Sequence, residues 1–425
     1  MRMKLSLMSL VLILICTFVV SCGGNSGVVT GELKTWHRIC LTVDGPGADE
    51  QDEINPFLDH RFDVTFTNGT NSFVVPGFFA AGGNAGETSA TGGTKWRAYF
   101  TPNTPGVWHY TAFLRSGKNI AIAEDPSGVQ PTVFSGSFTV SPTDKTAPDF
   151  RAKGILEYTG GHYLQFAGTK EYYLKGGADS PENFLAYEEI DGTFDADAGS
   201  GSYEHIGGFI HKYEAHVKDW KDGDPVWRNG KGKGIIGALN YLAGKGMNSV
   251  YFLTYNMDGG DGRDTWMWTG EEERERYDCS KLDQWEIIFS HMDKLGIMLH
   301  VVTQETENDM NLGGSSGLNP VRKLYYRELA ARFSHHPALI WNLGEENNTP
   351  DPDGKDTWRW DSKQRTEEVH CGEPFKIYLD IDEPGTHTIS FSMREDGVEF
   401  DKWLMTTDRE FGRPTDDGPA ERILQ

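Results

Sequence analysis

Hydrophobic and polar residues alternate in short segments through the first part of the chain. Hydrophobic side chains occupy every second position in three of these segments, Phe62 to Phe66, Trp96 to Phe100 and Trp108 to Leu114, and glycine, asparagine and proline lie between them. A period of two indicates strands with one buried face. Six or seven such strands within residues 29–140 predict an immunoglobulin-like β-sandwich, followed by a polar, proline-containing linker over residues 141–150.

The pattern changes after residue 150, where strands and helices alternate. Helical spacing and capping residues predict helices at 234–245, 280–295 and 319–333, and apolar runs predict strands at 172–174, 247–255, 297–303 and 338–343. We place Ser280 and Asp283 in a capping box and Gly296 at a helix C-cap. Such alternation is typical of a parallel α/β sheet or a (β/α)-barrel. We interpret residues 151–350 as a partial (β/α) TIM-type barrel of about four strand–helix units.

Strand-like alternation returns in the last part of the chain. Phe375, Ile377, Leu379 and Ile381 occupy alternate positions. Residues 351–425 are therefore expected to form a small C-terminal β module, so the predicted protein is multidomain.

The first 22 residues have the pattern of a targeting signal. Arg2 and Lys4 precede an apolar run from Leu5 to Val20 that is short for a membrane span, and Cys22 follows it directly. This order resembles a bacterial lipoprotein signal, in which Cys22 is lipidated after cleavage. The alternative is ordinary cleavage beside an incidental cysteine. The lipoprotein interpretation predicts a lipid-anchored protein of the bacterial cell envelope, at the outer membrane.

The charge balance excludes one class of partner. The chain has 40 Lys+Arg against 63 Asp+Glu, a formal net charge of -23, and contains no run rich in lysine or arginine. The sequence therefore argues against nucleic acids and other polymeric anions as ligands, because binding them requires concentrated positive charge. No Cys/His spacing typical of a metal site is present either, so the sequence predicts no metal and no cofactor.

The clearest candidate for chemistry is the segment from Ile340 to Asn347, at the end of the last predicted strand. Side chains alternate along a strand, so Asn342 and Glu346 are expected to share the polar face. A partly desolvated Glu346 would have a raised pKa and could serve as a general acid. The alternative is that Glu345 and Glu346 begin a solvated loop.

Two earlier loops supply residues of the kind that bind sugars. Aromatic rings cover the apolar face of a pyranose, and amide and carboxylate groups bind its hydroxyls. The candidate substrate-binding residues of these loops are Asn256, Asp261, Trp266, Trp268, Gln304 and Glu305.

Other interpretations of neighbouring residues stay open. Asp258, Asp261 and Asp264 could hold calcium, although their spacing lacks the register of an EF-hand. His300 has the same parity as Gln304 and could line the substrate site, but a core histidine with satisfied hydrogen bonds is the commoner role.

Several of these motifs resemble a known family. The segments Lys281–Glu286, Val301–Asp309 and Trp341–Asn347 are similar to those of secreted bacterial glycoside-hydrolase-like TIM-barrel proteins. Val75–Ala80 and Thr91–Arg97 resemble the N-terminal domain of unknown function in the same proteins, and the tail resembles their carbohydrate-binding-like β module. The resemblance implies that Glu346 is the acid/base of a retaining glycosidase and that Glu345 replaces the asparagine that precedes it.

The resemblance also implies that part of the expected catalytic domain is missing. A retaining mechanism needs a second carboxylate, which in this clan follows the seventh strand. Only 78 residues follow Asn347, whereas four more strand–helix units need about 120. We therefore expect a barrel truncated after its fourth strand and a glycoside hydrolase of extracellular polysaccharide or oligosaccharide with impaired catalysis. The alternative is a non-catalytic carbohydrate-binding or adhesion lipoprotein.

Overall fold

The computed structural model describes residues 25–196, 210–257, 263–305, 308, 311–313 and 318–344, with 383, 385, 405–408 and 410–412 near the C-terminus. The chain divides into two compact units, Met1–Gly314 with Leu318–Glu345, and Ser315–Gly317 with Glu346–Gln425. Nearly all described residues belong to the first unit. The C-terminal β module predicted at 351–425 lies almost entirely outside the described residues. Among the described residues, no helix has the length and apolar character needed to cross a membrane.

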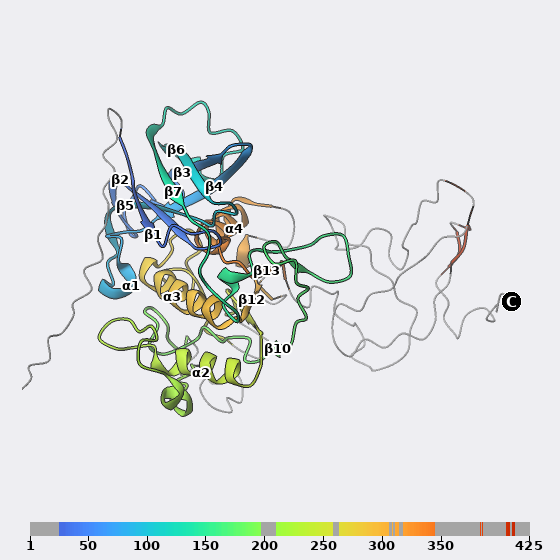
Figure 1. Ribbon diagram of the computed structural model, residues 1–425. Coiled ribbons are helices and arrows are strands. Elements are labelled where there is room, and N and C mark those ends of the chain that lie inside the picture. Colours follow the sequence, from blue (N-terminus) through green and yellow to red (C-terminus); the bar gives the residue numbers. More distant parts are fainter. Residues whose placement is uncertain are drawn as a thin grey trace, which may run out of the picture. The chain divides into compact units, whose positions relative to one another are not determined.

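An antiparallel sheet of seven strands dominates the first unit (Figure 1). Its hydrogen-bonded order is β1-β2-β5-β4-β3-β6-β7. The strands are β1 (Val28–Gly31), β2 (Ile39–Asp49), β3 (His60–Asn68), β4 (Asn71–Phe79), β5 (Gly92–Phe100), β6 (Gly106–Ser116) and β7 (Thr132–Val140). The short helices α1 (Ala85–Thr88) and η1 (Ile120–Ile122) lie in its connections.

The alternating residues form the core of this sheet, as their pattern predicts. Phe62, Val64 and Phe66 on β3 are at most 1% exposed. Phe66 stacks on Phe100 of β5 with ring centroids 4.3 Å apart. Strands distant in sequence therefore bury their apolar faces against one another, which is the main favourable contribution to folding.

The predicted immunoglobulin-like sandwich is nevertheless wrong, because the strands form one nearly closed, barrel-like sheet. Phe78 and Phe79 of β4 pair with β5, and this pairing joins what would be two separate sheets of a sandwich. At the other edge, the Thr35 amide donates to the Ser141 carbonyl and the Ser141 amide donates to the Leu33 carbonyl, both at 2.9 Å. Alternation identifies the buried face of a strand but not its hydrogen-bonded neighbours, so the sequence could not distinguish these arrangements.

A four-stranded parallel sheet follows in the same unit, in the order β10-β11-β12-β13. Its strands are β10 (Gly177–Ala178), β11 (Ser249–Leu253), β12 (Met298–Val302) and β13 (Leu339–Asn342). The helices α2 (Lys233–Gly244), α3 (Cys279–Leu295) and α4 (Pro320–Phe333) connect or precede them. The remaining elements are η2 (Phe150–Ala152), η3 (Glu214–Asp219) and the hairpin of β8 (Leu156–Glu157) with β9 (Gln165–Phe166).

The prediction of a partial TIM-type barrel is therefore also wrong. Strand–helix alternation occurs in both open sheets and barrels. The sequence of an individual strand does not determine whether the sheet closes into a barrel. The three long helices themselves agree closely with their predicted ranges.

Local signals explain where these helices begin and end. Asn319 caps α4 and accepts a hydrogen bond from the Arg322 amide at 3.0 Å, next to Pro320 at the first helical position. Gly296 ends α3 with a φ of 74°, as predicted. The predicted capping box of α3 is displaced, because Asp278, not Ser280, is the N-cap.

Helix α3 connects the two sheets. The Asp283 carboxylate accepts from the Gly86 amide at 3.3 Å, and the Gln284 amide group donates to the Gly86 carbonyl at 3.0 Å. At the start of the helix, the Cys279 amide donates to Glu50 at 2.7 Å. One continuous hydrophobic core runs from the antiparallel sheet to the parallel one.

Candidate functional site

Polar residues gather where the parallel strands end. β11 and β12 pair up to Leu253 and Val302, and β12 pairs with β13 up to Val302 and Asn342. Because the strands are parallel, the residues that follow them meet at one edge of the sheet. This is the edge at which open α/β sheets bind ligands.

A buried hydrogen-bonded network occupies this edge. The Asn256 amide donates to Glu305 Oε2 at 2.9 Å, and the Asn308 amide donates to Asn256 Oδ1 at 3.2 Å. Asn308 Oδ1 accepts from the Met257 backbone at 3.0 Å. All three side chains are at most 3% exposed. The structure thus brings together the predicted residues Asn256 and Glu305 and adds Asn308, which the sequence analysis did not select.

Gln304 links this edge to the end of β13. Its amide nitrogen donates to the Leu343 carbonyl at 2.9 Å, and its oxygen accepts from Thr303 and from Tyr326. At β13, Asn342 Oδ1 accepts from the Gly344 amide at 3.3 Å. Asn342 is half-buried and lies directly before the predicted catalytic pair.

Two alternate residues of β13 lie on an apolar face. Leu339 and Trp341 pack against the main core, which includes residues of α3 and α4. Leu343, which follows the strand with the same parity, is 67% exposed.

The candidate sugar-binding residues Trp266 and Trp268 are buried. Trp266 is 1% exposed and Trp268 is fully buried. The Trp268 ring packs against Tyr255 and Tyr325 at centroid distances of 4.8 and 5.4 Å. The loop folds these rings into the core, so neither ring presents a flat face to solvent.

His300 has the environment of a satisfied histidine. Lys175 Nζ lies 2.6 Å from His300 Nδ1 and the Tyr251 ring lies 4.9 Å away. Burial, with a smaller contribution from Lys175, lowers the pKa of His300 to about 4. A neutral ring that accepts from lysine fits the core alternative better than a role in substrate binding.

Four predicted positions lie outside the described residues. They are Cys22, Asp261, Glu345 and Glu346. The two glutamates directly follow Gly344, the last described residue after β13.

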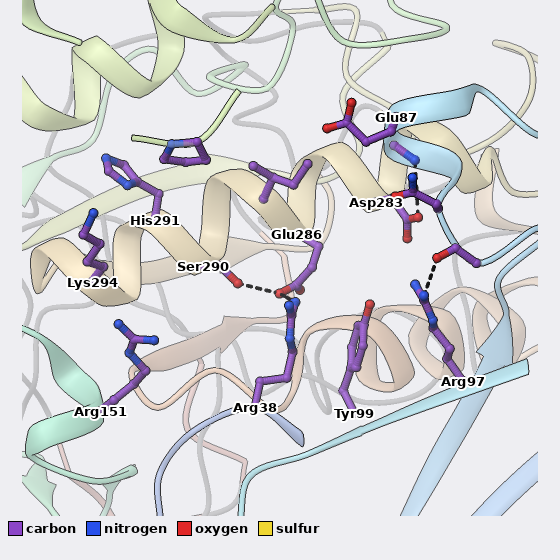
Figure 2. A pocket seen from close by; sticks show the side chains of 15 residues that line it. Arg38, Glu87, Arg97, Tyr99, Arg151, Asp283, Glu286, Ser290, His291 and Lys294 are labelled. Carbon is purple, nitrogen blue, oxygen red and sulfur yellow. Dashed lines mark hydrogen bonds and ion pairs between the residues drawn. The ribbon is translucent and has the colours of Figure 1, made fainter. Parts of the chain in front are cut away.

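A separate pocket of about 390 Å³ lies between the antiparallel sheet and α3. Figure 2 shows Arg38, Tyr99 and Arg97 extending from the antiparallel side toward α3, which presents Asp283 and Glu286 to them. Burial raises the pKa of the Asp283 carboxyl, although Arg97 acts in the opposite direction. The sequence analysis did not find this pocket, because its walls come from elements far apart in the chain.

Behind one wall of the pocket, Glu286 lies in a buried cluster with two histidines of the turn after α4. His336 Nε2 lies 3.2 Å from Glu286 Oε2, and His336 Nδ1 lies 2.6 Å from Asp293 Oδ2. Burial alone would lower the pKa of His336, but Asp293 and Glu286 raise it to about 9. His335 Nε2 lies 3.3 Å from Glu286 Oε1.

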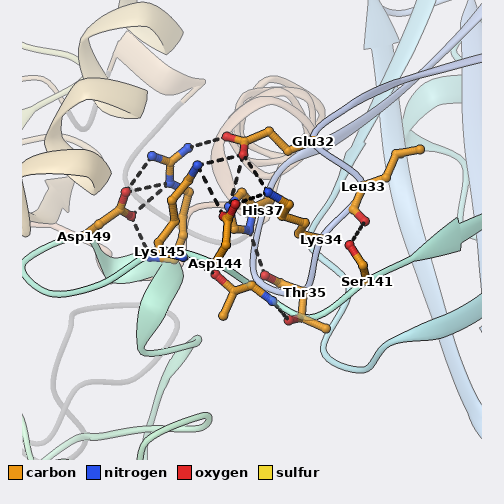
Figure 3. A network of polar contacts seen from close by, with 11 residues as sticks. Glu32, Leu33, Lys34, Thr35, His37, Ser141, Asp144, Lys145 and Asp149 are labelled. Atoms are coloured by element: carbon orange, nitrogen blue, oxygen red, sulfur yellow. Dashed lines mark hydrogen bonds and ion pairs between the residues drawn. The ribbon is translucent and has the colours of Figure 1, made fainter. Parts of the chain in front are cut away.

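A second histidine–carboxylate group lies near the surface of the antiparallel part (Figure 3). Glu32, His37 and Asp144 form it. Lys145 Nζ lies 2.7 Å from Glu32 Oε2, and Lys34 donates to Asp144. Ammonium groups therefore already neutralise these carboxylates.

Comparison with known proteins identifies part of the antiparallel sheet. Residues 32–115 match the family described as "Domain of unknown function (DUF5060)". This match confirms the predicted N-terminal domain of unknown function. "Uncharacterized protein P23" from Formosa agariphila is 55% identical over 67 residues, which is 16% of this chain and 16% of that protein.

Solved structures give weaker matches. A "putative glycoside hydrolase" from Bacteroides vulgatus ATCC 8482 has 16% sequence identity and a TM-score of 0.46, and the match covers 74% of this chain and 50% of that chain. The type III pullulan hydrolase from Thermococcus kodakarensis has 13% identity and a TM-score of 0.15, covering 62% of this chain and 38% of that chain. The chain thus spans half or less of these proteins, and such low TM-scores do not establish a shared fold.

Proposed function

We propose a carbohydrate site of the glycoside hydrolase type at the carboxyl ends of β11, β12 and β13. The observation that carries the proposal is the buried network of Asn256, Glu305 and Asn308 at this edge. Buried amides and carboxylates that bond one another hold the loops above them in a fixed geometry. The motif resemblance of Trp341–Asn347 supplies the reaction class.

In this proposal Glu346 is the general acid that protonates the glycosidic oxygen. It follows Asn342, the last residue of β13, by four positions in the sequence. The substrate is an extracellular polysaccharide or oligosaccharide that is neutral or weakly charged, because the chain carries a formal net charge of -23.

One observation favours a binding protein without turnover as the second candidate. Glu305 is 3% exposed and accepts a hydrogen bond from Asn256, so it is committed to the network. A retaining glycosidase needs two carboxylates about 5 Å apart, and one of them must attack the sugar. A protein that lacks an available nucleophile would bind its glycan and leave it intact.

Parallel measurements of binding and hydrolysis separate the two candidates. The full chain is tested on a panel of neutral and weakly acidic polysaccharides by affinity electrophoresis and by release of reducing ends. Hydrolysis that falls at least 10²-fold in Glu346→Gln, and less in Glu345→Gln, supports the enzyme. Binding without hydrolysis supports the second candidate, and absence of both contradicts the proposal.

We also propose that Cys22 anchors the protein in the bacterial outer membrane by a lipid. The support is the order of basic residues, apolar run and cysteine over residues 2–22. Labelled palmitate should enter the wild-type protein and not Cys22→Ala. Unlabelled, freely secreted wild-type protein would contradict the anchor.

A further inference from the structure

The buried cluster between α3 and the turn after α4 contains polar atoms without hydrogen bonds. Neither ring nitrogen of His335 makes a hydrogen bond within the described structure, and Asp293 Oδ1 has no partner there either. His335 is 7% exposed and Asp293 is 5% exposed, so water does not reach them freely. A buried polar group without a partner is costly and indicates that an ion or an ordered water completes the site.

The distances in this cluster match those between the ligands of a metal ion. Nitrogen and oxygen ligands lie about 2.0–2.1 Å from zinc, so two ligands of a tetrahedral site are about 3.3 Å apart. His336 Nε2 lies 3.2 Å from Glu286 Oε2, and His335 Nε2 lies 3.3 Å from Glu286 Oε1. One ligand atom from each of the three residues lies within 4.8 Å of the others.

The surroundings of these atoms also fit a metal site. Asp293 bonds His336 Nδ1 at 2.6 Å, which turns His336 Nε2 toward Glu286. Metal-binding histidines usually have such a carboxylate behind them. Arg38 and Ser290 both donate to Glu286 Oε1. They fix the carboxylate so that Oε2 faces His336 and Oε1 faces His335.

We propose that Glu286, His335 and His336 bind one divalent transition-metal ion, with zinc as the preferred ion. Two imidazoles and one carboxylate form a donor set that suits zinc better than magnesium or calcium, which prefer oxygen ligands. The ion would coordinate a ring nitrogen of His335, which makes no hydrogen bond in the described structure, and would tie α3 to the turn before β13. Glu286 lines the 390 Å³ pocket, which provides a path for the ion to enter.

The group of Glu32, His37 and Asp144 provides a natural control. It also has ligand atoms within 4.8 Å of one another. Lys34 and Lys145 bond its carboxylates, however, and Glu32 is 41% exposed. A cation bound there would have to displace these ammonium groups, so we expect no tight metal binding.

The test is a metal titration of the full chain, purified in detergent and stripped with a chelator. Zinc chloride is added in a calorimeter, and cobalt chloride is added in a parallel absorption experiment that reports the ligand set. We expect one zinc ion to bind per chain and the thermal unfolding midpoint to rise by several degrees with zinc. The absorption bands of the cobalt-loaded protein should be those of a site with nitrogen and oxygen ligands. His335→Gln should abolish this binding, and because the hydrogen bond at His335 is accepted by its backbone carbonyl and not made by its ring, the variant should remain folded.

Two further variants make the test specific. Asp293→Asn should weaken zinc about 10- to 100-fold, as expected for loss of the carboxylate behind a ligand. His37→Gln should bind zinc like the wild type. The proposal is overturned if the wild type binds no zinc, if His335→Gln binds it equally well, or if binding disappears in His37→Gln. The first outcome would mean that water completes the cluster.

Discussion

The buried environment of Glu50, at the junction between the antiparallel sheet and α3, predicts how the stability of the protein changes with pH. It follows the last residue of β2, is 4% exposed, and accepts from the Cys279 amide at the start of α3 at 2.7 Å. Burial, with a smaller contribution from the Asp278 carboxylate, raises the pKa of Glu50 from 4.5 to about 8. Glu50→Gln keeps the accepting oxygen and removes the ionisation, so it isolates this effect.

The sign and size of the effect follow from the raised pKa. Between pH 4.5 and about 8, Glu50 binds a proton in the folded state and has lost it in the unfolded state. Its contribution to stability is therefore fully present below pH 4.5 and is lost as the pH rises through about 8. The loss approaches 1.4 kcal/mol per pH unit, which gives about 2–3 kcal/mol between pH 5.5 and 7.5.

Urea unfolding of the wild type and Glu50→Gln at several pH values measures this contribution. Other titrating groups cancel in the difference between the two proteins, so Glu50→Gln should gain about 2–3 kcal/mol relative to the wild type from pH 5.5 to 7.5. Glu53→Gln, at an exposed position on the same turn, should show no such gain. Parallel stability profiles for the wild type and Glu50→Gln would refute the buried environment of Glu50.

Two further predictions concern packing and backbone geometry. Trp268→Ala should destabilise the protein by about 3–5 kcal/mol, because the ring is fully buried; an unchanged thermal midpoint would show that the ring is exposed after all. Gly296→Ala should lower the free energy of unfolding by at least about 1 kcal/mol more than Gly246→Ala. Both glycines have a positive φ, but only a Cβ added at position 296 would meet the Pro148 carbonyl oxygen, at 2.5 Å. Equal urea midpoints for the two alanine variants would contradict the close approach of α3 to Pro148.

Local structure could be predicted from the sequence where neighbouring residues determine it. Asn319 and Pro320 begin α4 and Gly296 ends α3 because capping depends on a few adjacent residues. The pairing of β4 with β5 depends on contacts between strands that no local pattern contains. For that reason most of the predicted strands were found, whereas the sandwich and the partial barrel were wrong. The strand predicted at 172–174 was also wrong, because Tyr172 makes only an isolated bridge and the first strand of the parallel sheet is β10.

The residues of the candidate site likewise include some that the sequence could predict and others that it could not. Asn256, Gln304 and Glu305 follow adjacent parallel strands, so their meeting could be predicted from the order of elements alone. Whether a loop tryptophan faces solvent or core depends on distant partners, and Trp268 is covered by Tyr255 and Tyr325. The cluster of Glu286 and His336 joins residues 50 positions apart, so a search for short metal-binding spacings could not find it.

Hydrogen–deuterium exchange with a bound oligosaccharide tests the central claim most directly, because it locates the ligand on the chain. The oligosaccharide is taken from the best polysaccharide of the binding panel, and exchange is compared with and without it. The account predicts that protection is concentrated in the peptides that follow β11, β12 and β13, namely residues 254–257, 303–308 and 342–347. Protection confined to other segments, such as the antiparallel strands or the pocket beside α3, would contradict a carbohydrate site at the carboxyl ends of the parallel strands.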